Sequence, residues 1–338
     1  MGWLGGEDPD AQVRCPAVSA SLTGGRTSAV ESSRTWPLID RIMLAFCWIA
    51  GISACVIAFA IVAFMAYKGL EFLRPNLFVE RPNATFDQSK SGGFLDPLIG
   101  TILLTTMGTL VAIPVSVAVA IWLTEYGRPF GLARAVESAV EIIAGTPSIV
   151  LAIFGLIIFQ QEVFGFLSFR AEGGSVFGRS FFTAALMMSL IALPLIVGAT
   201  REGLQAIPSH VREASYALGK SKWATIQRVL LPSVRPAIGT GTVLGMGRIA
   251  GDTAIVVVLL GASLQIQGYG DIPGLDILRG NGGTLTSYTY VNSPAGEGAA
   301  PDKAYAAAFV LLMISIGLNL FVSRLARSGK SATAAATR

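Results

Sequence analysis

Charged residues and the side chains that most often perform catalysis are scarce in this 338-residue chain. It has one histidine, three cysteines and only 14% charged residues, whereas a soluble domain usually carries about a quarter. A single histidine, His210, cannot build a histidine-based metal site, and Cys15, Cys47 and Cys55 lack the spacing of a metal-ligand pair. The sequence therefore predicts no metal site, no disulfide framework and no Cys–His catalytic pair.

Apolar residues are abundant instead. They make up 52% of the chain, and apolar runs of about 20 residues recur along it. This pattern is typical of an all-α polytopic protein in a lipid bilayer, and it excludes a soluble enzyme and a disordered scaffold. The basic isoelectric point of 9.1 is explained by the excess of Lys and Arg in cytoplasmic loops of membrane proteins, so we expect no nucleic-acid partner.

The apolar runs predict six transmembrane helices within residues 36–327. They are centred on residues 42–67, 98–123, 142–159, 181–200, 237–264 and 304–325. We expect residues 1–35 to be a disordered tail and residues 328–338 to be a second tail. No internal duplication of the kind seen in many secondary transporters is visible.

The distribution of positive charge predicts the orientation. Sixteen of the 25 Lys and Arg residues lie before residue 42, after residue 323, in residues 124–141 and in residues 201–235, and eight lie in the loops of the other side. Because cytoplasmic segments carry the excess of Lys and Arg, both termini and the loop 201–235 are expected in the cytoplasm.

The loop 201–235 carries a pattern of two short helices. Residues 213–218 form the first, which Gly219 ends, because glycine readily adopts the left-handed conformation of a helix C-terminus. Residues 223–230 form the second, and Pro232 is expected to end the segment. Small residues on the first helix allow another protein to approach closely. A docking surface and a solvated interfacial loop both fit this pattern.

The same loop resembles that of the permease subunits of bacterial ABC importers, which share a Glu-Ala-Ala…Gly…Ile-x-Leu-Pro motif. The matching residues here are Glu213-Ala214-Ser215, Gly219, Val229 and Leu231-Pro232. Ser215 and Val229 depart from the motif by small changes that keep the packing. The resemblance implies that Glu213, Ala214 and Gly219, with Leu231 and Pro232, serve coupling to a separate ATPase subunit.

ATP is expected on that partner subunit, and no cofactor is expected in this chain. Gly219-Lys220-Ser221 looks like the end of a phosphate-binding P-loop. The P-loop needs a glycine five positions before Gly219 and a preceding strand. That position is Ala214, and no strand is expected there.

Arg248 and Asp252 are the charged residues inside the fifth run. Arg248 lies near the middle of that run, where an unpaired charge costs at least about 2.5–3.5 kcal/mol. Asp252 follows one helical turn later on the same face. A structural ion pair and an anion-handling site on a translocation path both explain this arrangement. A carboxylate beside the Arg favours phosphate, which carries protons at neutral pH, over sulfate.

Glycines accompany this pair along the fifth run. Gly241 and Gly245, and likewise Gly247 and Gly251, have the four-residue spacing that permits close helix approach. We expect them to pack against a neighbouring helix or a partner subunit.

The third run contains Thr146-Pro147-Ser148. A proline within a span, flanked by hydroxyls, leaves polar groups free to line a path. A helix start with proline in its first turn is the other interpretation. In the first interpretation, Thr146 and Ser148 line the substrate path.

The segment around Arg248 is similar to that of phosphate-specific permeases, which carry Gly-Arg-x-x-Gly-Glu-Thr-Ala. Here it is Gly247-Arg248-Ile249-Ala250-Gly251-Asp252-Thr253-Ala254, with Asp252 for Glu and Ile255 where Pro is usual. Residues 145–150 and 303–308 also resemble this family, and the latter are nearer its PstA type. The resemblance covers residues 40–327, and places an ABC permease core at 98–325.

This resemblance implies a type I (MetI-like) ABC importer permease in a bacterial plasma membrane, with Arg248, Asp252 and Thr253 on the phosphate path. It implies no enzymatic activity in this chain. The implied partners are a second homologous permease, two copies of an ATP-binding subunit and an extracytoplasmic phosphate-binding protein. Transport of another oxyanion or small solute, and an ion-coupled secondary transporter, remain the alternatives.

Overall fold

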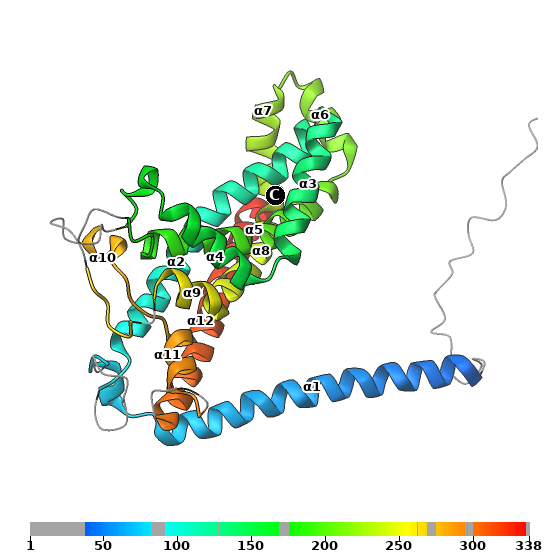
Figure 1. Ribbon diagram of the computed structural model, residues 1–338. Coiled ribbons are helices and arrows are strands. Elements are labelled where there is room, and N and C mark those ends of the chain that lie inside the picture. The colour runs from blue at the N-terminus through cyan, green and yellow to red at the C-terminus, as the bar shows by residue number, and fades with distance from the viewer. Residues whose placement is uncertain are drawn as a thin grey trace, which may run out of the picture. The chain divides into compact units, whose positions relative to one another are not determined.

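The computed structural model describes residues 38–82, 92–127, 129–168, 176–261, 263–268, 275–294, 296 and 300–335, and of residues 275 and 325–335 only the backbone. The predicted tail 1–35 lies outside this part of the chain. The described residues up to 61 and those from 62 onward form two compact units. Figure 1 shows the course of the chain.

Helix α1 (Leu38–Phe72) begins in the first unit and confirms the first predicted apolar run as a helix. No residue of its most apolar 18-residue stretch is buried. A helix that is apolar on every side and not covered by protein is typical of a span that faces lipid. In the second unit, its last turns pack through Gly69 against Phe309.

Four of the described helices are long and apolar enough to cross a membrane. Three of them lie in the second unit: α2 (Leu95–Ile121), α5 (Phe181–Gln205) and α12 (Pro301–Ala335). They correspond to the second, fourth and sixth predicted runs. The fourth is α1. The helical backbone of α12 continues into the segment 328–338 that was expected to be a tail.

The third and fifth predicted runs are not single straight helices. Helices α3 (Phe130–Gly145) and α4 (Ser148–Phe159) form a pair bent by 111°, because Thr146 and Pro147 have extended backbones between them. The predicted fifth run is divided into α8 (Leu231–Gly251) and α9 (Ala254–Leu259). By length and composition the described residues provide four spans, or five with the bent pair, so the predicted count of six is not confirmed.

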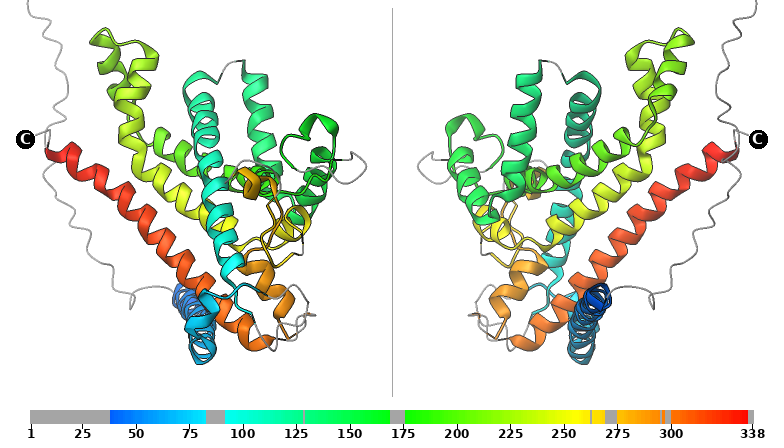
Figure 2. Two further views of the ribbon diagram at one scale, coloured as in Figure 1. Left: turned by 90° about the vertical axis from the view of Figure 1, so that its left-hand side faces the viewer. Right: turned by 90° about the vertical axis from the view of Figure 1, so that its right-hand side faces the viewer.

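Shorter helices complete the second unit. They are η2 (Pro75–Phe78), η4 (Glu162–Phe164), α6 (Ser209–Ala217), α7 (Lys222–Thr225), α10 (Leu275–Arg279) and α11 (Leu285–Asn292). Figure 2 shows α6 and α7 at one end of this unit and α11 at the opposite end. The loop that carries the coupling motif and the segment before α12 are therefore far apart.

Two π-helical turns, η3 (Trp122–Tyr126) and η5 (Ile226–Leu230), interrupt the regular helical pattern. The second lies directly before Pro232. The proline ring removes a backbone donor and clashes with the carbonyl four residues earlier, and a wider turn relieves that clash. Helix therefore continues from α7 through η5 into α8, and the prediction that Pro232 ends the segment is wrong.

The main core lies where α2 and α5 meet α4, α8 and α9. Its fully buried side chains include Met188, Ile196, Ile249, Ile255 and Leu259. Helix α5 begins at a capping box in which Ser180 and Thr183 bond each other's backbone N–H groups, which fixes its start against this core.

The glycines of α8 divide into two groups. A side chain at Gly241 would meet the Ile196 backbone of α5 at 2.9 Å, and one at Gly245 would meet Ala192 at 3.2 Å. The predicted close approach is therefore confirmed for this pair. Nothing lies within 4 Å of such a position at Gly247 or Gly251, so neither is needed for packing within the described part of this chain.

We expect Gly241→Val to lower the melting temperature of the detergent-solubilised protein, and Gly247→Val to leave it close to that of the wild type. Both substitutions put the same residue into the same helix, but only the first forces α8 away from α5. Overpacking of this kind costs about 1–3 kcal/mol. Equal melting temperatures for the two variants would contradict the close packing at Gly241.

Candidate functional site

The predicted coupling loop forms two short helices. α6 is followed by Gly219, whose φ of +74° lies in the left-handed region, as the sequence predicted. The N-cap of α7 is Ser221, whose hydroxyl accepts a hydrogen bond from the backbone N–H of Ala224. Gly219 thus sets the end of α6, and Ser221 sets the start of α7.

A hydroxyl pair holds α6 and α7 together. Ser215 Oγ and Thr225 Oγ1 lie 2.9 Å apart, and both side chains are buried. Ser215 stands where the importer motif has its second alanine. The substitution therefore adds a hydrogen bond between the two helices without adding a bulky group.

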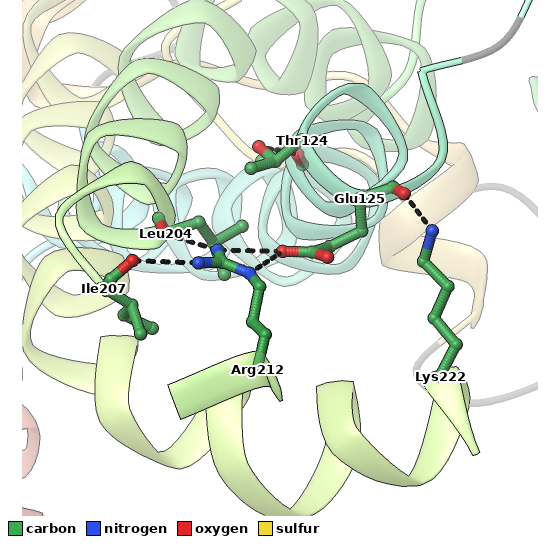
Figure 3. Close-up of polar contacts among 7 residues, drawn as sticks. Thr124, Glu125, Leu204, Ile207, Arg212 and Lys222 are labelled. Carbon is green, nitrogen blue, oxygen red and sulfur yellow. Dashed lines mark hydrogen bonds and ion pairs between the residues drawn. The ribbon is translucent and has the colours of Figure 1, made fainter. Parts of the chain in front are cut away.

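Arg212 joins this loop to the membrane-embedded part (Figure 3). Its Nε donates to Glu125 Oε1 at 3.0 Å, and its Nη2 lies 2.9 Å from the same oxygen as an ion pair. Its Nη1 donates to the Ile207 carbonyl at 2.8 Å, and its Nη2 donates to the Leu204 carbonyl at 2.9 Å. The Glu125 side chain, in the π-turn after α2, is only 6% exposed. One guanidinium therefore connects α6 with the ends of α2 and α5.

Lys222 makes a second connection to the same turn. Its Nζ donates a hydrogen bond to the Glu125 carbonyl and lies 4.4 Å from the centre of the Tyr126 ring. The charge of Lys222 is thus held by a carbonyl and an aromatic face at once. α7 as well as α6 is tied to the end of α2.

The side chains predicted to contact an ATPase lie on the outer face of the loop. Glu213, Ala214 and Gly219 are exposed. Beside them, Leu218 is 78% and Trp223 is 60% exposed. Both are large apolar side chains on a loop that is otherwise polar and basic. This exposed face has the character of a binding surface.

Leu231 and Pro232 have a different place. They are half-buried at the start of α8, next to a small core that contains Ile121, Leu204 and Ile226. They therefore stand between the loop and the membrane-embedded helices rather than on the exposed face.

Arg248 and Asp252, predicted to share one helical face, are separated by the end of α8. Arg248 is exposed in the last turn of α8 and has no ion pair or hydrogen bond with any described residue. Asp252 is 6% exposed, has an extended backbone and accepts the N–H of Ile255 in the first turn of α9. No intrahelical ion pair joins them, so the alternative of a structural Arg–Asp pair is wrong.

The remaining predicted path residues lie at helix ends. Thr253 is the N-cap of α9, and Ser148 is the first residue of α4, directly after Pro147. Thr146 donates its hydroxyl to the Ile142 carbonyl at 2.6 Å. The helix-start interpretation of this segment is confirmed, and Pro147 is its N-cap. α4 and α9 share one core cluster, so Ser148 and Thr253 begin neighbouring helices.

Sequence reasoning missed the connection through Glu125, Tyr126 and Lys222. Glu125 counted only as one charge of a loop, and its partner Arg212 lies 87 positions away. No local pattern links two residues at that separation. The sole signal was an acidic residue at the end of an apolar run, followed by an aromatic ring.

Comparison with known proteins identifies the family. Residues 112–328 match the model of the binding-protein-dependent transport system inner membrane component. The chain is also 34% identical over 230 residues to the phosphate transport system permease protein PstA 1 of Mycobacterium tuberculosis, which covers 68% of this chain and 69% of that protein.

Solved structures agree on the fold. The chain is similar to an inward-facing MetNI methionine ABC transporter chain, with a TM-score of 0.52 and 18% identity over 68% of this chain and 93% of that one. It is also similar to a bacterial alginate ABC transporter chain, with a TM-score of 0.58 and 16% identity over 86% and 95% of the two chains. The predicted MetI-like permease fold is confirmed. The chain belongs to the family of inner membrane components of binding-protein-dependent transport systems, and is a multi-pass membrane permease subunit rather than an enzyme.

Proposed function

We propose that this chain is the PstA-type permease subunit of an ATP-driven phosphate importer, and that Arg248 contacts phosphate on its path. The observation that carries the phosphate contact is the exposed guanidinium of Arg248 in the last turn of α8, without an ionic partner among the described residues. The planar fork of an arginine bonds oxyanions at two points. The likeness to PstA 1 supports phosphate as the oxyanion.

The residues around Arg248 keep it available. Asp252 is occupied by the N–H of Ile255, so its carboxylate fixes the break between α8 and α9 instead of neutralising the Arg. Gly247 and Gly251 leave open space beside Arg248. Along the same path, polar groups come from Thr253, Thr146 and Ser148. The site binds phosphate weakly, because tight binding would prevent release.

The importer contains, besides this chain, a second homologous permease, two ATP-binding subunits and an extracytoplasmic phosphate-binding protein. Both termini and the loop 201–235 face the cytoplasm, in keeping with the excess of Lys and Arg there. ATP binding closes the ATPase pair, the exposed face around Glu213 moves with it, and the spans open outward. Hydrolysis returns them and releases phosphate inward.

Phosphate specificity is tested by uptake into bacteria that lack this gene. We expect the wild-type chain to restore uptake of labelled phosphate at low external concentration, and an excess of unlabelled sulfate to compete weakly. Abolition of uptake by ATP depletion with the ion gradient intact separates an ABC importer from an ion-coupled transporter. Restored uptake of sulfate or of an organic solute without phosphate uptake would show that the substrate assignment is wrong.

A further inference from the structure

We propose that Glu125 is the positioning residue through which the coupling loop moves α2, and this rests on the proposed function. The loop has two arms, α6 and α7. Arg212 of α6 bonds the Glu125 carboxylate, and Lys222 of α7 bonds the Glu125 carbonyl. Both arms therefore hold one residue, which directly continues the helix of α2.

The connection can transmit motion because the Arg212 side chain is held by several acceptors at once. The guanidinium of Arg212 also binds the carbonyl of Leu204, in the last turn of α5, and that of Ile207, just beyond the helix. It thus fixes the distance between the ends of α2 and α5 at the loop. A shift of α6 carries the Arg212 side chain with it, and the end of α2 must follow or the ion pair must break.

Burial makes breaking the pair unfavourable. The side chains of Arg212 and Glu125 are 20% and 6% exposed, so separating them would leave a poorly solvated charge on each side. The pair between Arg201 and Glu137 differs, since its side chains are 38% and 33% exposed and it joins α5 to α3 without involving α6 or α7. That pair is a matched control.

The small apolar core beneath the loop supports the same transmission. Ile226 and Leu230 of the second π-turn pack with Ile121 of α2 and Leu204 of α5. Apolar contacts of this kind resist compression but have no preferred partner atom. The Arg212–Glu125 ion pair also resists separation of the loop from α2. The loop can therefore pull α2 as well as push it.

The test uses the complete importer, purified and reconstituted in proteoliposomes, with Glu125→Gln and the control Glu137→Gln. We expect Glu125→Gln to retain its ATPase subunits and to hydrolyse ATP, while phosphate transported per ATP falls about tenfold, within the usual range of coupling energies. Glu137→Gln should keep the wild-type ratio. Arg212→Lys, which keeps the charge but not the fork, should restore part of the ratio relative to Arg212→Ala.

Hydrogen exchange along the α2 backbone provides a readout that does not depend on the substrate. ATP should change exchange near the end of α2 in the wild-type complex and in Glu137→Gln, but not in Glu125→Gln. An unchanged ATP response in Glu125→Gln, or loss of its ATPase subunits, would overturn the positioning role. Failure of the wild-type complex to transport phosphate, with the exchange pattern as expected, would instead refute the proposed substrate alone.

Discussion

Replacing Arg248 with Gln is expected to abolish phosphate uptake while the protein remains in the membrane at wild-type level. Arg248 is exposed and has no ionic partner among the described residues, so its removal leaves no unpaired buried charge. Glutamine retains a polar side chain, but it is shorter and offers one amide donor group in place of a charged fork of five N–H donors. We expect uptake to fall at least about a hundredfold, in line with the loss of a charge-assisted bidentate contact.

The control for this substitution is Arg235→Gln. Arg235 is also exposed and lies in the same helix, near its opposite end. Uptake through Arg235→Gln should stay close to that of the wild type, after correction for the amount of each protein in the membrane. Wild-type uptake through Arg248→Gln, or equal losses in both variants, would remove Arg248 from the phosphate path.

Reversing the charge of Glu213 is expected to release the ATPase subunit. Glu213 lies on the exposed face of α6 beside Ala214, and it takes no part in the Arg212–Glu125 pair that holds the loop in place. Glu213→Lys therefore changes the binding face without disturbing the fold of the loop. A lysine where the partner receives a carboxylate introduces repulsion and an unpaired charge, which typically costs 2–5 kcal/mol at an interface.

Co-purification of the ATPase with tagged permease measures this effect. We expect recovery of the ATPase to fall more than tenfold for Glu213→Lys. Glu162→Lys is the matched control, because Glu162 is exposed in the short helix η4, outside the coupling loop. If Glu213→Lys retained the ATPase at wild-type level, the coupling loop would not be its docking surface.

The elements that depend on local chemistry were predictable from the sequence. Long apolar runs predicted α1, α2, α5 and α12, since twenty apolar residues can satisfy their backbone only as a helix in lipid. Gly219 ended α6 because its position requires a positive φ. Family resemblance then supplied the fold, which hydropathy alone does not distinguish among polytopic helical proteins.

The helix breaks were harder to predict. Hydropathy treated residues 237–264 as one run, although Gly251-Asp252-Thr253 contains a residue type that commonly begins helices. The carboxylate of Asp252 captures the N–H of Ile255, and this bond competes with continuation of α8. An average over twenty residues cannot detect a competition decided by one side chain.

The contacts of Arg212 and Lys222 with Glu125 could not be predicted from local sequence. They depend on where α2 ends relative to the coupling loop, and this follows from the packing of α2 on α5. Three hydrogen bonds and one ion-pair contact of Arg212, with nitrogen–oxygen distances between 2.8 and 3.0 Å, follow from that packing. A sequence shows which charges are present but not which of them meet.

Two π-turns belong to this connection: η3 contains Glu125, and η5 directly follows α7. A π-turn is equivalent to one residue added to an α-helix, and one residue rotates everything beyond it by about 100°. Deleting a single residue from either turn would restore a regular helix, yet aim Glu125 or the loop a quarter turn away from its partner. The number of residues in η3 and η5, as well as their identity, therefore specifies how the coupling loop meets α2. Chimaeras that exchange loops between related permeases must preserve both turns at their full length.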